Sequence, residues 1–136
     1  MEVAVARTIL VIDDNRDARV IAARILRYLG EEAVCVASGA EAMEFLRHER
    51  PKLVLLDLDM PDMDGYAVVR RIRSEPGLAG LPVVMFSAAT EKDLLAALVC
   101  GADAYLRKGS CSVDDIRCSV RRWEESDHPQ QRADRA

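Results

Sequence analysis

The feature that most constrains the fold is an uninterrupted apolar stretch, Leu53-Val54-Leu55-Leu56, near the middle of the chain. A strand with one face in water alternates apolar and polar residues, whereas a strand that is apolar throughout has both faces covered, as in a parallel sheet. Four other short aliphatic stretches, at residues 8–12, 33–37, 82–86 and 104–106, alternate with longer segments of helical periodicity. This order predicts an α/β fold with a doubly wound, five-stranded parallel sheet, five surrounding helices and right-handed crossovers.

The helical segments carry recognisable start signals. Ser38 followed by Glu41 is a capping box, and either Asp14 or Asn15 can cap the first helix. Acidic relatives of the capping box are Thr90 with Asp93 and Ser112 with Asp115. The apolar positions predicted to face the core are Ala18, Ile21, Ala22, Ile25 and Leu29 in the first helix, which Gly30 ends, and Val113, Ile116, Val120 and Trp123 in the last.

Composition narrows the class of protein. A chain of 136 residues that is 50% hydrophobic can form one core without disulfides or a structural metal. The formal net charge is -4 and the basic residues are scattered, which argues against nucleic acid as a direct partner. The four cysteines have no CxxC spacing, so we interpret them as small buried thiols in a reducing compartment.

The ends of the chain and its apolar stretches predict where the domain lies. No apolar run approaches the roughly 20 residues of a membrane span, and the first residues lack the pattern of a signal peptide. We therefore expect a cytoplasmic protein that does not bind membranes. Residues 1–6 are expected to form an N-terminal extension, residues 7–123 the folded domain, and residues 124–136 a polar, disordered tail.

Polar side chains follow four of the predicted strands. Asp13 and Asp14 follow the first, Asp57 the third, Ser87 the fourth, and Lys108 lies just beyond the fifth. In an open parallel sheet these carboxyl ends form the ligand crevice. Three carboxylates there would repel each other unless a cation joined them, and oxygen ligands favour Mg²⁺ or Mn²⁺.

Such a metal site is completed by phosphoryl oxygens, since Mg²⁺ binds one or two carboxylates and keeps open positions. Asp57 closes an apolar strand and is the natural nucleophile. Lys108 can pair with one phosphoryl oxygen and the Ser87 hydroxyl can hydrogen-bond another. The pattern therefore predicts a metal-assisted phosphoryl acceptor.

Four stretches of the sequence also resemble a known family. They are Leu10-Val11-Ile12-Asp13-Asp14, Leu55-Leu56-Asp57-Leu58-Asp59-Met60-Pro61-Asp62-Met63-Asp64-Gly65, Ser87-Ala88-Ala89 and Tyr105-Leu106-Arg107-Lys108. Together they are similar to the receiver domains of two-component response regulators, and the likeness spans about residues 7–123. It implies a flavodoxin-like sheet of strand order 2-1-3-4-5 and a stand-alone regulator, which would act either by protein contact, as chemotaxis-type regulators do, or as an intermediate or sink in a phosphorelay.

The resemblance implies a role for each matching residue. Asp57 would be the phosphoacceptor, while Asp13, Asp14 and the backbone carbonyl of Asp59 would complete the metal pocket. Ser87 and Lys108 would contact the phosphoryl group, and Ser87 and Tyr105 would form the switch. Output would run through the fourth helix, fifth strand and fifth helix.

The resemblance also implies partners. A sensor histidine kinase or a histidine phosphotransfer protein would donate the phosphoryl group, and a separate downstream protein would bind the phosphorylated surface. The chain would catalyse only its own phosphorylation and dephosphorylation. Ala88 is small, which would leave the phosphoryl site open to a partner.

One departure from the family pattern concerns the residue after Lys108. The family usually has proline there, with a cis peptide bond, whereas this chain has Gly109. A cis bond without proline costs about 2.5–4 kcal/mol, so a trans peptide in a more mobile loop is expected. Because of this glycine, the family pattern does not predict where Lys108 lies or what geometry the output face has.

Simpler interpretations stand beside these roles. Asp14 taken alone is as compatible with a helix cap as with a metal ligand. Asp62 and Asp64 are interpreted as loop and cap residues, and Gly65 is expected to supply a positive φ in that turn. Lys108 can be read as a solvated loop lysine, and Tyr105 as a half-buried strand residue.

Two other functions are compatible with parts of the pattern. The stretch Leu55-Leu56-Asp57-Leu58-Asp59 also resembles the nucleophile motif of haloacid dehalogenase phosphatases. That family, however, places its nucleophile strand near the start and its second acidic pair after the lysine. The other alternative is a binding module that keeps the receiver fold but no longer switches. Gly109 is evidence for this alternative. The presence of the complete set of acidic residues together with Ser87 and Lys108 is evidence against it.

Overall fold

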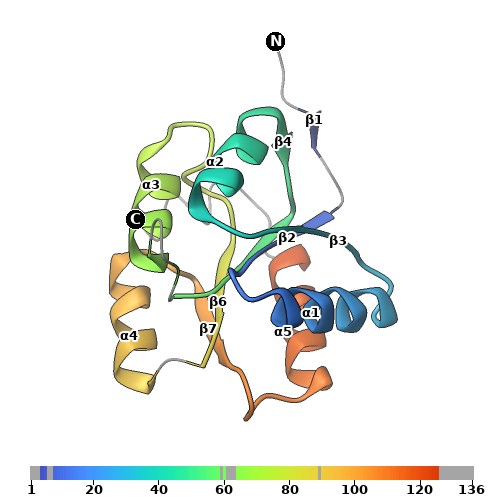
Figure 1. Ribbon diagram of the computed structural model, residues 1–136. Helices are drawn as coiled ribbons and strands as arrows, with labels where there is room; N and C mark the ends of the chain where they lie inside the picture. Colours follow the sequence, from blue (N-terminus) through green and yellow to red (C-terminus); the bar gives the residue numbers. More distant parts are fainter. Residues whose placement is uncertain (1–3, 6–7, 59, 61–63, 89, 126–136) are drawn as a thin grey trace.

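The computed structural model describes residues 4–5, 8–58, 60, 64–88 and 90–125. Its centre is a parallel five-stranded sheet in the order β3-β2-β5-β6-β7 (Figure 1). Counted in chain order these five strands are arranged 2-1-3-4-5, which confirms the predicted topology. Their bounds are β2 (Thr8–Ile12), β3 (Glu32–Val36), β5 (Leu53–Leu56), β6 (Val83–Ser87) and β7 (Ala104–Arg107).

Helices cover both faces of the sheet, as the apolar strands require. In Figure 1 the first and last helices, α1 (Arg16–Tyr28) and α5 (Val113–Glu125), lie on one side of the sheet. The other side is covered by α2 (Gly39–His48), α3 (Gly65–Ser74) and α4 (Glu91–Cys100). Every residue of β5 is buried between the two layers. No helix among the described residues has the length and apolar character to cross a bilayer.

A second, two-stranded parallel sheet lies beside the main one. It pairs β1 (Ala4–Val5) with β4 (Glu49–Arg50). The sequence did not predict it, because two-residue strands carry no periodicity. Part of the expected N-terminal extension is therefore strand, and α5 continues to Glu125, two residues into the expected tail. Residues 126–136 lie outside the described residues.

The helix caps follow the predicted signals. Asn15, and not Asp14, caps α1, since its side chain accepts a hydrogen bond from the Ala18 N–H at 2.9 Å. Ser38 caps α2 in the same way, since its side chain accepts from the Glu41 N–H, and Thr90 caps α4 by accepting from the Asp93 N–H. Asp64 caps α3, as expected.

The apolar stripe of α1 differs from the prediction. Ile21, expected in the core, is 57% exposed, while Ala23 and Leu26, which were not expected there, are buried together with the predicted Ala22. The spacing of apolar residues in the sequence predicts how wide the apolar stripe is. Which side of that stripe faces the sheet depends on how the helix is rotated about its axis when it packs. In α5 the first turn is exposed, so Val113 is 39% exposed and burial begins at Ile116.

The cysteines and one glycine also differ from expectation. None of the four thiols is fully buried: Cys118 is exposed and Cys35, Cys100 and Cys111 are half-buried. All four are free. Gly65 has no positive φ. A Cβ on this residue would lie only 2.6 Å from the backbone oxygen of Asp57, so glycine is needed for close approach and not for turn geometry.

Candidate functional site

The carboxyl edge of the sheet brings the predicted polar residues together. Ile12 of β2 pairs with Leu56 of β5, so the residues that follow, Asp13 and Asp57, lie side by side. The Asp57 N–H donates to the Ile12 carbonyl at 2.9 Å, which continues the ladder past the strand end. On the other side, Lys108 donates its backbone N–H to the Ser87 carbonyl at 2.9 Å.

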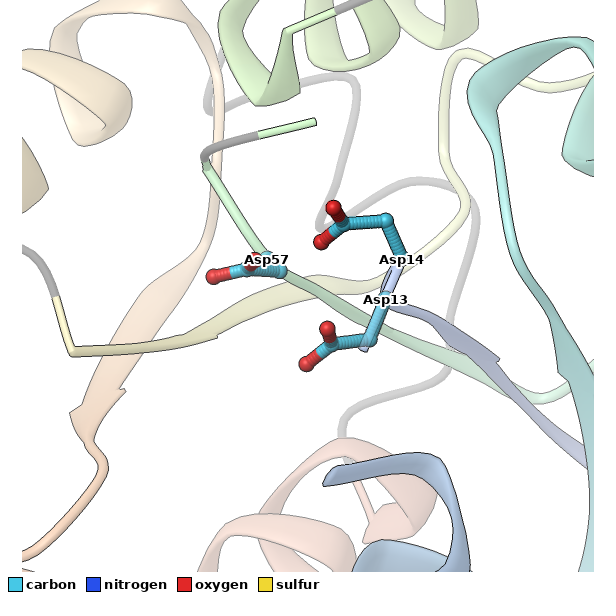
Figure 2. Close-up of side chains that lie close together, drawn as sticks. All are labelled: Asp13, Asp14 and Asp57. Carbon is cyan, nitrogen blue, oxygen red and sulfur yellow. The ribbon is translucent and has the colours of Figure 1, made fainter. Parts of the chain in front are cut away.

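Three carboxylates form the centre of this site. One oxygen from each of Asp13, Asp14 and Asp57 lies within 4.8 Å of the others. Figure 2 shows Asp13 and Asp14 at the end of β2 and Asp57 at the end of β5, with their carboxyl groups pointing toward the same open side. Asp13 and Asp57 are buried and Asp14 is exposed. This donor set fits a small divalent cation that retains water ligands.

Lys108 supplies the positive charge beside this cluster. Its ammonium forms an ion pair with Asp13 and lies 4.0 Å from Oδ1 of Asp57. The same ammonium lies over the Phe86 ring, 5.6 Å from the centroid. Phe86 was not among the predicted site residues. The aromatic residue directly before Ser87 is the signal that could have identified it, because a ring face attracts cations.

The electrostatics of Asp57 follow from its position. Burial raises the pKa of this carboxyl above its usual value, and the nearby Asp13 charge adds to the rise. A hydrogen bond from Ser87, the Lys108 charge and the Leu58 N–H oppose it. The net effect is a raised pKa, so the site without a cation disfavours the ionised form of Asp57.

Two contacts that the sequence analysis missed orient Asp13. Its Oδ1 accepts a hydrogen bond from the Asn15 N–H at 2.9 Å. Its backbone carbonyl accepts one from the Arg19 guanidinium at 2.9 Å. Asn15 therefore caps α1 and also helps to fix the first carboxylate of the site.

Gly65 couples the site to α3. Its N–H donates to the Leu58 carbonyl at 2.7 Å, and a Cβ here would lie 2.7 Å from the Leu58 Cα. The start of α3 thus packs directly on the backbone that carries Asp57.

The site opens into a cleft of about 510 Å³. Besides the acidic residues, Ser87 and Lys108, its wall includes α1 residues. Ile21, which is exposed on α1, lines this cleft instead of the core. Ala88 is exposed and also lines the cleft. The remaining lining residues are Asn15, Asp17 and Ala18.

The other predicted residues lie around this centre. Tyr105 is half-buried on β7, pairs with Met85 and packs against the core on the α3 and α4 side. Gly109 has φ of 86° and the Lys108–Gly109 peptide is trans. Asp59 and Asp62 lie outside the described residues.

Comparison with known proteins places this geometry in a family. The family model for the response regulator receiver domain matches residues 9–121. A gliding motility regulatory protein of Myxococcus xanthus is 33% identical over 115 residues, which cover 84% of this chain and 15% of that protein. Other curated relatives are named as transcriptional regulators, and the chain spans less than half the length of each.

Solved structures agree with the family model. The receiver domain of a signal transduction histidine kinase from Syntrophus aciditrophicus has a TM-score of 0.82 at 31% identity, with 91% of this chain and 94% of that chain covered. The receiver domain of a sensor histidine kinase from Pseudomonas aeruginosa PAO1, which has a magnesium ion coordinated in its active-site cleft, has a TM-score of 0.79 at 28% identity, with 87% and 97% covered. The family model covers nearly all of the described residues, and the strand order and the polar residues at the strand ends agree with it. The chain belongs to the response regulator receiver domain family.

Proposed function

We propose that this domain accepts a phosphoryl group on Asp57 from a histidine kinase or a histidine phosphotransfer protein, in a reaction that requires Mg²⁺ or Mn²⁺. The observation that carries the proposal is the cluster of Asp13, Asp14 and Asp57 with Lys108 at its side. The domain catalyses only its own phosphorylation and dephosphorylation. It acts in the cytoplasm through contacts with a separate protein, without direct contact with nucleic acid or membrane.

The charge of the cluster supports the metal requirement. Three carboxylates and one ammonium have a formal net charge of -2 when all are ionised. Asp13, Asp14 and Asp57 would hold the cation, and the resemblance adds the Asp59 backbone carbonyl. A bound divalent cation supplies neutralisation of charge on the phosphoryl oxygens.

The residues of this chain have distinct roles in the transfer. An Asp57 carboxylate oxygen attacks phosphorus, the phosphorus–nitrogen bond of the phosphohistidine donor breaks, and an acyl phosphate forms. Lys108, 4.0 Å from Asp57 Oδ1, pairs with a phosphoryl oxygen. The Ser87 hydroxyl hydrogen-bonds another. The open cleft lets the donor imidazole approach in line.

The output surface is the face of α4, β7 and α5. Tyr105 lies on β7 within this face and, with Ser87, forms the switch. Leu95 and Val99 of α4 are 48% and 89% exposed, one turn apart. These apolar side chains fit a protein partner, since exposed apolar patches mark interaction surfaces.

Mass spectrometry of the intact protein tests the acceptor. Wild type, Asp57→Ala and the control Asp114→Asn are incubated with acetyl phosphate, with and without Mg²⁺. Asp114 is an exposed acidic residue of α5, away from the cleft. We expect one Mg²⁺-dependent phosphoryl adduct on wild type and on Asp114→Asn, and none on Asp57→Ala. Circular dichroism should show that Asp57→Ala remains folded.

Two results would contradict the proposal. An adduct that persists in Asp57→Ala would place the acceptor elsewhere. Repeated turnover of p-nitrophenyl phosphate by wild type would favour the phosphatase interpretation. If neither acetyl phosphate nor a phosphorylated histidine phosphotransfer protein yields an adduct, the domain is a non-switching binding module.

A further inference from the structure

A row of arginines lines one side of α1. Arg16, Arg19, Arg24 and Arg27 border a groove of about 390 Å³ that also contains Cys35 of β3. The acidic residue of α1, Asp17, lines the phosphoryl cleft and not this groove. The structure thus gathers basic residues that look scattered in the sequence, in a chain whose formal net charge is -4.

These arginines are not neutralised by carboxylates in the described part of the chain. The ion pairs there involve other cations, such as Arg73 with Asp103 and Arg117 with Asp114. Arg16, Arg24 and Arg27 are exposed, and Arg19 donates a hydrogen bond to a backbone carbonyl. Unpaired cations with a shared face create a positive potential that favours acidic ligands.

The groove wall opposite α1 is formed by Cys35 of β3, while the charged residue of that strand, Glu32, lies at its exposed start. Cys35 is half-buried, and its Sγ lies 3.8 Å from the Arg19 carbonyl oxygen. Burial raises the pKa of this thiol, and the charges of Arg19 and Arg27 oppose the rise. The positive charges of both guanidinium groups therefore reach the part of the groove around Cys35.

The groove reaches the edge strand of the sheet at Cys35. β3 is the end strand of the main sheet. The Val36 carbonyl accepts from the Asp13 N–H at 3.2 Å, so it faces β2. Because backbone groups alternate in direction along a strand, those of Ala33 and Cys35 face outward. An exposed row of this kind is a template for an added strand.

The helix and the strand beside the groove are both long enough to hold a short peptide. Arg16 and Arg27 are eleven positions apart on α1, about 17 Å at the rise of an α-helix. From Glu32 to Val36, β3 spans about 13 Å at the rise of a strand. We propose that an extended, acidic segment of a partner protein docks here, adding to the edge of β3 while its carboxylates face the α1 arginines.

A peptide fits this groove better than a nucleic acid does. Strand addition uses the outward N–H and C=O groups of β3, for which a sugar–phosphate backbone has no matching ladder. A long polyanion would also extend beyond the groove onto a protein of net charge -4. The surface is separate from the phosphoryl cleft, so its test does not depend on phosphorylation of Asp57.

Fluorescence anisotropy tests the charge requirement. The probe is a labelled eight-residue peptide of alternating Glu and Val, and the proteins are wild type, Arg24→Gln/Arg27→Gln, and Arg47→Gln/Arg71→Gln. The last variant removes the same charge from exposed arginines of α2 and α3. We expect binding to weaken about fourfold in the first variant, since each exposed ion pair contributes about a factor of two, and to change little in the second. Equal losses in both variants would overturn the proposal.

Backbone methylation tests the strand. Two further peptides carry N-methyl groups on either all Glu or all Val nitrogens. Only one of these sets can face β3, so we expect one peptide to lose about tenfold in affinity and the other to bind nearly as the parent does. Equal binding of both would overturn strand addition. Tighter binding of an eight-nucleotide oligo-dT, with the same loss in Arg24→Gln/Arg27→Gln, would assign the groove to nucleic acid instead.

Discussion

Replacing Gly65 with alanine tests the coupling between α3 and the site. Gly65 begins α3, and its added Cβ would lie 2.6 Å from the Asp57 carbonyl oxygen and 2.7 Å from the Leu58 Cα. Both are backbone atoms, so no side-chain rotation relieves the clash. An ordinary contact begins at 3.4 Å. The two segments must therefore separate by roughly 0.8 Å.

This displacement has two measurable costs. Overpacking of a close backbone contact lowers the free energy of unfolding by about 1–3 kcal/mol. For a domain of this size each kcal/mol lowers Tm by about 4 °C, so the expected loss is about 4–12 °C. The same shift moves Asp57 relative to Asp13, and misplacement on this scale slows phosphoryl transfer by roughly tenfold or more.

Urea unfolding and the rate of phosphorylation by acetyl phosphate measure the two effects. The matched control is Gly77→Ala. Gly77 is exposed, has no positive φ, and its Cβ would meet only the end of the Arg50 side chain, at 3.0 Å. The control should be neutral or stabilised by about 0.4–1 kcal/mol. The reasoning is refuted if Gly65→Ala is as stable as the control and is phosphorylated at the wild-type rate.

Three further predictions concern charge and backbone strain. The pKa of Asp57 is higher in the folded state than in the unfolded state. Metal-free wild type should therefore lose stability relative to Asp57→Asn as the pH rises from the unfolded-state pKa through the folded-state pKa. A stability difference in urea unfolding that does not change with pH would contradict this. Arg73→Met removes the guanidinium 2.8 Å from buried Asp103 and should cost about 3 kcal/mol in the same assay, whereas a loss below about 0.5 kcal/mol would show that the pair is worth no more than a surface one. Gly109→Ala places a side chain at φ of 86° in open space, so it should cost about 1 kcal/mol through strain alone; an unchanged Tm would refute that.

The sheet was predictable because its strands are apolar on both faces. The apolar stretch Leu53–Leu56 predicted a covered parallel strand, and the alternation of strands and helices predicted a doubly wound sheet. The strand order itself came from the resemblance to receiver domains. The same logic placed Asp13 and Asp57 together, because parallel strands end at one edge. What the sequence could not give was the rotation of each helix. Ile21 fits the helical period of the core, yet packing turns it into the cleft.

Contacts between distant segments were also beyond the sequence. Either Asp14 or Asn15 satisfies the capping preference, and only the geometry shows that Asn15 caps α1. Gly65 follows turn-forming residues, so a positive φ was the natural expectation. Its actual constraint comes from the backbone at Asp57 and Leu58, which lies several residues earlier in the chain. Glycine identity alone does not distinguish these two causes.

The substitution of glycine for the family's proline after Lys108 does not leave that lysine unsupported. Its N–H is fixed to the Ser87 carbonyl, and its ammonium lies over Phe86 and pairs with Asp13. All of these contacts precede Gly109 in the chain, so the lysine is held from the strand side. A phosphoryl group on Asp57 would bring about two negative charges within reach of this ammonium, against the single charge of Asp13. Under the proposed function Lys108 therefore shifts its pairing toward Asp57 on phosphorylation, while the turn that follows stays tied to β7, because the Ser110 and Cys111 N–H groups donate to the Arg107 carbonyl.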